Sequence, residues 1–251
     1  MIFKRAIAKL RAQDWTAIGI EVGIVIVGVF IANQVSNWNQ DRLERRETIE
    51  LLQALKPEML GLIDYVDKTN TYYATTGRYA ETALRGWARD PAVSDTQFVI
   101  DAYQASQITG IGTNGASWAI AFGGDRLSKI SDRQVGDPLS FLIRYNYDLI
   151  DVPALYTRYR DHVRTVIPNE IQQVIRKRCG DSVNNYGSNV LPPTCDITLP
   201  PSSASATAAA LRAAPELRGE LAQHRAEVAT VLFNTNMVGT QARRLYSALP
   251  R

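Results

Sequence analysis

Two cysteines, Cys179 and Cys195, are the side chains in this sequence best placed to react with each other. They enclose a segment rich in glycine, asparagine, serine and proline, which gains order when its ends are joined. A disulfide here would stabilise the fold by about 3 kcal/mol on the chain-entropy model, and it would persist only in an oxidising compartment. The alternative is two isolated reduced cysteines. Metal binding is disfavoured, because neither His162 nor His224 has ligand spacing to either cysteine.

A second pattern, G-I-G-T-N-G from Gly110 to Gly115, matches the letters of the dinucleotide-binding motif. That motif holds a pyrophosphate only inside a βαβ unit. No convincing strand precedes it, so we interpret the segment as a loop. His162 lies among arginines, as is typical of a solvated helix face, and no P-loop, G-x-S-x-G, C-x-x-C or H-E-x-x-H pattern occurs. We therefore predict a non-enzymatic protein with no catalytic residues, no cofactor and no metal site.

An aromatic and basic group in the middle of the chain could line a pocket for an anionic or aromatic ligand. Packing in the core and at its rim is the alternative interpretation. The group comprises Tyr145, Tyr147, Tyr156 and Tyr159, with Arg144 and Arg158 beside them.

One ionisable residue, Glu21, lies within an otherwise apolar segment that runs from Trp15 to Ala32. As a helix, the stretch from Trp15 to Trp38 would be roughly 34 Å long at about 1.5 Å per residue, which matches a hydrocarbon core of roughly 30 Å. Trp15 and Trp38 would then anchor the two interfaces. We predict a single transmembrane helix over 15–37. A cleaved signal peptide and a buried core helix are the alternatives, and the bulky residues 33–38 disfavour cleavage.

Small residues in this span form two pairs with the spacing that lets helices approach closely in lipid. Gly19 and Gly23 form one pair, and Gly28 and Ala32 form the other on the opposite face. Glu21 shares the Gly28 face, where its carboxyl could donate a hydrogen bond to a neighbouring helix. It could instead extend to the lipid headgroups. We expect the span to contact the lipid bilayer and to pair in a homo-oligomer or a larger membrane complex.

The net charge of +3 is located at the N-terminus. Residues 1–14 hold four basic side chains against Asp14, and the remaining 237 residues contain 24 basic and 24 acidic side chains. A neutral body lacks the basic surface that a nucleic acid requires, so we expect no nucleic-acid partner. The basic tail and the predicted disulfide favour a topology with residues 1–14 in the cytoplasm and residues 38–251 outside it, in the periplasm if the cell has one.

Beyond the span, apolar spacing predicts an all-α fold, in which the transmembrane helix continues into a periplasmic bundle of about four to six helices. Pro57 should kink the first helix, whose apolar stripe favours core packing over a coiled coil. The stripe consists of Leu52, Leu55, Met59, Leu62 and Val66. Further helices are predicted over 71–89, from an N-cap at Ser94 to residue 103, and in short stretches around 118–120 and 127–135. The region 138–178 is also predicted to be helical, with bends at Pro153 and Pro168. A linker over 200–206 precedes a final helix over 216–249.

The sequence of the span and of the residues after it resembles that of a known family. The segment AIGIEVGIVIVGVFIANQVSNWN over 17–39, followed by QDRLERRE over 40–47, resembles the signature of a family of functionally uncharacterised bacterial single-span proteins. Glu21, Gly28, Ala32, Gln34 and the Asn-Trp-Asn exit at 37–39 fall on that pattern, whereas Asn33 stands where a leucine is usual. A weaker similarity covers 117–145. The resemblance implies a membrane-anchored helical protein and no activity.

These observations together predict a membrane-anchored scaffold or accessory subunit of a bacterial inner-membrane complex. The alternative is a periplasmic sensor or ligand-binding module. Because 14 residues before the span are too few for a signalling domain, such a sensor would have to signal through a partner protein.

Overall fold

The computed structural model describes residues 15–110, 116–123, 126–150, 156–183 and 188–250. In these ranges the chain forms eight α-helices and only two strands, each of two residues, which confirms the predicted all-α fold. The chain divides into two compact units, Met1–Gln53 and Ala54–Arg251. Below they are called the N-terminal unit and the C-terminal unit.

The described part of the N-terminal unit belongs to helix α2, which runs from Trp15 to Trp87. From Gly19 to Glu50 no side chain of this helix is buried. The apolar window that starts at Gly19 has a mean hydropathy of 1.7 and is long enough to cross a membrane. This helix therefore agrees with the prediction of one candidate membrane span near the N-terminus.

In the C-terminal unit, α2 continues without the break that we expected before residue 71. Pro57 lies within the helix and is exposed, and the apolar residues on either side of it, Leu55 and Met59, are buried. Packing of these neighbours holds the helix across the hydrogen bond that proline cannot donate. The expectation of a separate helix over 71–89 is therefore wrong, whereas the predicted apolar stripe does pack into the core.

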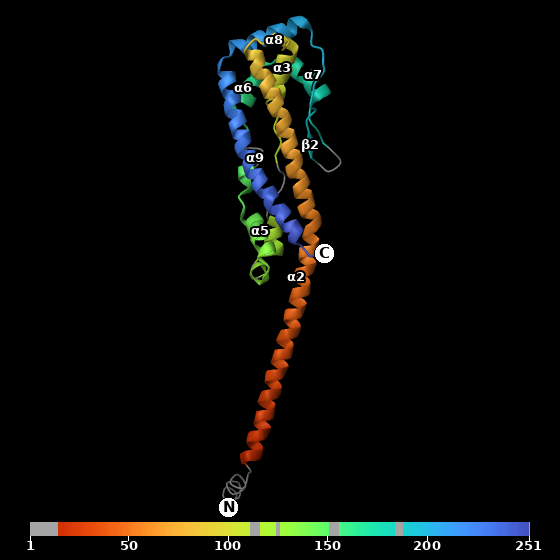
Figure 1. The fold of residues 1–251 in the computed structure, drawn as a ribbon, viewed down its shortest axis with the longest axis vertical. Coiled ribbons are helices and arrows are strands. Elements are labelled where there is room, and N and C mark those ends of the chain that lie inside the picture. The colour runs from red at the N-terminus through yellow and green to blue at the C-terminus, as the bar shows by residue number, and fades with distance from the viewer. Residues whose placement is uncertain (1–14, 111–115, 124–125, 151–155, 184–187, 251) are drawn as a thin grey trace, which may run out of the picture. The chain divides into compact units, whose positions relative to one another are not determined.

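Helix α9 (Glu216–Ala248) runs antiparallel to α2 in the C-terminal unit. The ribbons of the two helices run in opposite directions (Figure 1), and polar contacts between them follow the same order. Asn70 Nδ2 donates to Asn236 Oδ1 at 2.8 Å, and at greater residue numbers in α2 the Glu81 carboxylate lies 3.4 Å from Arg225 Nη2. One turn before Asn70 in α2, Val66 packs against Gly239 of α9, and the residues of the apolar stripe of α2 are buried.

Shorter helices complete the C-terminal unit. Helix α5 packs on α9, α3 packs on α8, and α6 contacts both α8 and α9. Ser94 caps α3 as predicted, because its side chain accepts a hydrogen bond from the Gln97 N–H. The bounds are α3 Asp95–Gln104, α4 Ala116–Ala121, η1 Leu127–Lys129, α5 Arg133–Arg144, η2 Tyr147–Ile150, α6 Arg158–Val166, α7 Asn169–Cys179 and α8 Pro201–Ala213.

Helix α8 corrects another expectation, because residues 200–206 begin a helix rather than form a linker. Proline is well suited to a first helical turn, and alanine has the highest helix propensity. Ala204, Ala208 and Leu211 recur on one face and are buried. The eight α-helices of the described ranges also exceed the expected four to six, because α8 replaces an expected linker and the stretch 138–178 contains more than one helix. Pro168 precedes α7 as predicted, whereas Pro153 and residues 111–115 lie outside the described ranges.

Candidate functional site

The two cysteines form a disulfide, as the sequence predicts, with 2.06 Å between the sulfur atoms and 5.6 Å between the Cα atoms. Cys179 is the last residue of α7, and both cysteines are buried. The loop that they close contains a small antiparallel hairpin of β1 (Ser182–Val183) and β2 (Asn189–Val190). The disulfide thus ties this hairpin to the end of α7.

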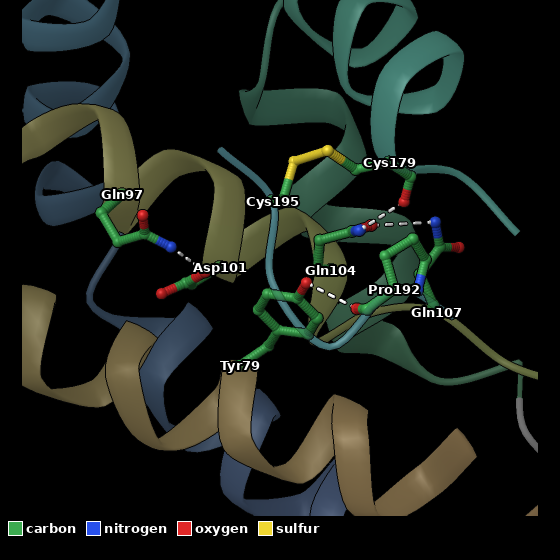
Figure 2. Close-up of a disulfide and its surroundings, with 8 residues drawn as sticks. All are labelled: Tyr79, Gln97, Asp101, Gln104, Gln107, Cys179, Pro192 and Cys195. Atoms are coloured by element: carbon green, nitrogen blue, oxygen red, sulfur yellow. Dashed lines mark hydrogen bonds between the residues drawn. A yellow bond between two sulfur atoms is a disulfide. The ribbon is translucent and has the colours of Figure 1, made fainter. Parts of the chain in front are cut away.

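A buried polar network lies beside the disulfide (Figure 2). Gln104 Nε2 donates to the Cys179 carbonyl at 2.7 Å, and Gln107 Nε2 donates to Gln104 Oε1 at 3.2 Å. From α2, the Tyr79 hydroxyl donates to the Pro192 carbonyl at 2.8 Å. Side chains from α2 and α3 therefore bind the backbone at both ends of the loop and position it.

Asp101 is a buried carboxyl in the same region, with a side-chain environment that sequence reasoning missed. Asp101 is 1% exposed, and Gln97 Nε2 donates a hydrogen bond to its Oδ1 at 2.7 Å. No basic side chain in the described ranges lies within ion-pairing distance of it. Burial raises the pKa of Asp101 to about 7. The available sequence signal was an aspartate between Ile100 and Ala102, inside an otherwise apolar helical run.

This carboxyl makes the stability of the fold depend on pH. Because its pKa is raised in the folded state, its contribution is present at low pH and is lost as the pH rises from about 4 to about 7. We expect Asp101→Asn, which is neutral at every pH, to stabilise the protein by roughly 2–3 kcal/mol more at about pH 8 than at about pH 5. Thermal unfolding of the full chain in mild detergent at both pH values measures this difference.

The control for this experiment is Asp161→Asn, which removes an exposed carboxylate from α6. We expect it to change the melting temperature equally at both pH values. A pH-independent effect of Asp101→Asn would contradict the assignment of a buried, neutral carboxyl.

The two histidines have separate structural partners. His224 is buried, its Nδ1 lies 2.8 Å from Thr157 Oγ1, and burial lowers its pKa to about 4. His162 Nδ1 lies 2.9 Å from the Glu220 carboxylate. In the part of the chain that the structure describes, no group of three or more histidine, cysteine or acidic residues could hold a metal ion.

The four tyrosines that could have lined a ligand pocket do not form one cluster. Tyr145 and Tyr147 contact each other, with ring centroids 5.3 Å apart. Tyr159 is fully buried and donates to the Ala102 carbonyl, whereas Tyr156 is mostly exposed. The structure therefore favours packing over a shared pocket for this set.

The predicted membrane-packing positions all lie on α2. Glu21, Gly28 and Ala32 are exposed, and a Cβ atom added at Gly19, Gly23 or Gly28 would meet no other atom within 4 Å. Trp38 is 64% exposed, with the Arg42 guanidinium 5.9 Å from its ring. Trp15 is the first described residue of α2, and its side chain lies outside the description.

Comparisons with protein-family models, with curated proteins and with solved structures find no match for this chain. The resemblance to a family of single-span proteins therefore stays a prediction that the span residues carry.

Proposed function

We propose that this protein is a membrane-anchored, non-enzymatic scaffold or accessory subunit of a bacterial inner-membrane complex. The chief support is an apolar surface of α2 that is exposed within the described part of the N-terminal unit. From Gly19 to Trp38 the side chains of α2 are exposed or half-exposed, and the large aliphatic ones expose more than half of their surface. Lipid and neighbouring helices are the surroundings in which such a surface is stable.

The proposed topology has residues 1–14 in the cytoplasm and residues 38–251 in the periplasm. The basic N-terminal tail supports this orientation, because positive charge is retained on the cytoplasmic side. The Cys179–Cys195 disulfide supports it independently, since such a bond persists in an oxidising compartment.

The proposed contact with other subunits uses the face of the span that carries Glu21, Gly28 and Ala32. Helices in lipid associate where small residues allow close backbone approach, and a carboxyl on that face can form an interhelical hydrogen bond. Residues at Gly23 and Gly28 lie about 140° apart around a helix, so they serve different faces. Substitutions at these two glycines therefore form a matched pair.

The test measures the assembly of the full-length protein in mild detergent by light scattering after size-exclusion chromatography. We expect an oligomer or a larger complex, which Gly28→Leu disrupts and Gly23→Leu leaves intact. Mass spectrometry of the co-purified proteins separates a homo-oligomer from a mixed complex. A monomer that neither substitution changes, with no co-purified protein, would contradict the proposal.

A further inference from the structure

Three arginines gather on the C-terminal unit, in an arrangement that the scaffold proposal does not use. Arg160 and Arg164 lie on α6, and Arg176 lies near the end of α7. Arg160 and Arg164 are half-buried, whereas Arg176 is exposed. We call this group the arginine cluster.

Shared hydrogen-bond partners hold the arginine cluster together. Arg160 Nη1 donates to the Ser106 carbonyl, and Arg164 Nε lies 3.3 Å from the Ser106 hydroxyl oxygen. Arg164 also stacks on Tyr103, with its guanidinium carbon 4.8 Å from the ring centroid. Arg176 Nη1 lies 3.5 Å from the hydroxyl of the same tyrosine. The three guanidinium groups therefore converge on Tyr103 and Ser106.

The positive charge of this cluster is only partly balanced. Asp181 is an acidic residue on the Arg160 and Arg164 side of the cluster; burial raises its pKa, which the two arginines act to lower, and its carboxylate accepts a hydrogen bond from the Tyr72 hydroxyl at 3.0 Å. Within the described ranges, no carboxylate lies within 4 Å of any of the three guanidinium groups. With Asp181 ionised, these three arginines and this aspartate together carry a charge of +2.

The cost of this arrangement is visible at Arg164. Its pKa is lowered, first by burial and then by the neighbouring positive charges of Arg160 and Arg176. Like charges that are partly removed from water repel one another and lose hydration unless a counter-charge lies near them. An anion in the cluster would relieve both the repulsion and the loss of hydration.

Several N–H donors of the arginine cluster have no hydrogen-bond acceptor among the described residues. Each guanidinium carries five N–H donors in a planar fork. With described residues, Arg160 uses one donor, and Arg164 and Arg176 use two each. Planar forks pair with the oxygens of phosphate groups in a bidentate manner, which gives geometric selectivity as well as binding energy.

We propose that the arginine cluster binds a dianionic phosphate group, either inorganic phosphate or a small phosphomonoester. The charge of −2 on this group matches the +2 left by Arg160, Arg164, Arg176 and Asp181. This site would give the C-terminal unit a ligand, and it stands independently of the scaffold role, since it involves no residue of the span.

The test is isothermal titration calorimetry of the full-length protein in mild detergent, in chloride buffer at about pH 7.5, where phosphomonoesters are mainly dianionic. The ligands are inorganic phosphate, glycerol 3-phosphate and acetate. Tighter binding of glycerol 3-phosphate than of phosphate assigns the site to an organic phosphomonoester, and the reverse order assigns it to inorganic phosphate. Acetate is expected to bind at least tenfold more weakly than either.

The decisive variant is Arg176→Gln, because this side chain is the exposed one of the three and its hydrogen bonds, to the Tyr103 hydroxyl and to Asn169 Oδ1, are both long at 3.5 Å. We expect at least a tenfold loss of phosphate affinity, since a hydrogen bond to a charged group contributes about 1.5–3 kcal/mol. Arg158→Gln, an exposed arginine at the start of α6 with the same change in charge, is the matched control and should alter the affinity by less than about twofold.

Three results would overturn the phosphate site. These are no measurable binding of either phosphate ligand to the wild-type protein, equal binding of acetate, and equal losses in Arg176→Gln and Arg158→Gln. The last result would mean that only general surface charge attracts the anion. Far-UV circular dichroism of both variants verifies that they are folded.

Discussion

Gly86→Ala is expected to destabilise the C-terminal unit by about 3 kcal/mol, near the upper end of the usual cost of overpacking. A Cβ atom at Gly86 would lie 2.2 Å from Cδ2 and 2.5 Å from Cγ of Phe98. Phe98 is fully buried, with Trp87 packed edge-on at 5.0 Å and the Arg212 guanidinium carbon 4.8 Å from its ring centroid. The ring therefore cannot move aside, and α2 and α3 would have to separate.

A second glycine in the same helix provides the control. A Cβ atom added at Gly77 would meet nothing within 4 Å. We expect Gly77→Ala to leave stability unchanged or to raise it by up to about 1 kcal/mol, because alanine is the better helix former. Urea unfolding of the full chain in mild detergent, followed by circular dichroism, compares the two variants. Equal stability of both would contradict the close approach of α2 and α3.

Removal of the disulfide has the other large expected effect. The double substitution Cys179→Ala and Cys195→Ala releases a loop with a sequence separation of 16 residues. The gain in unfolded-state entropy corresponds to about 3 kcal/mol, which lowers the melting temperature by roughly 6–12 °C. The buried hydrogen bonds from Gln104 and Tyr79 to the loop should weaken with it. Thermal unfolding measures the change.

Reduction and alkylation test the bond itself. A reductant should lower the melting temperature of the wild-type protein and leave the double variant unchanged. In the intact, non-reduced protein isolated from cells, Cys179 should resist alkylation. Alkylation of Cys179 before reduction would show that the bond is absent in the cell, and it would remove the support that the disulfide gives to a periplasmic location.

Much of the helical architecture could be predicted because its signals are local. The Ser94 cap, the final helix after Pro215 and the apolar stripe of the first helix each depend on residues within a few turns of one another. The disulfide could also be predicted, since only two cysteines occur and they enclose a turn-rich segment.

One local signal was misleading, and one expected helix boundary does not occur, for the same physical reason. The Pro-Pro-Ser-Ser run at residues 200–203 is typical of a linker, and a separate helix was expected from residue 71. In the folded chain, buried neighbours on one face decide the conformation in both places, with Ala204 and Ala208 in α8 and Thr69 and Tyr72 in α2. Tertiary packing therefore outweighed the propensity of the exposed residues.

The sequence alone determined the apolar span, the basic tail and the cysteine pair, because hydropathy, charge and rarity are properties of short segments or of composition. The tertiary structure determined the environments of Asp101, Gly86 and the arginine cluster. The environment of Asp101 depends on the helices that exclude water from it, and Gly86 matters because Phe98 packs against it. Arg164 and Arg176 meet at Tyr103 only after α3, α6 and α7 have packed, since these residues are more than fifty positions from that tyrosine.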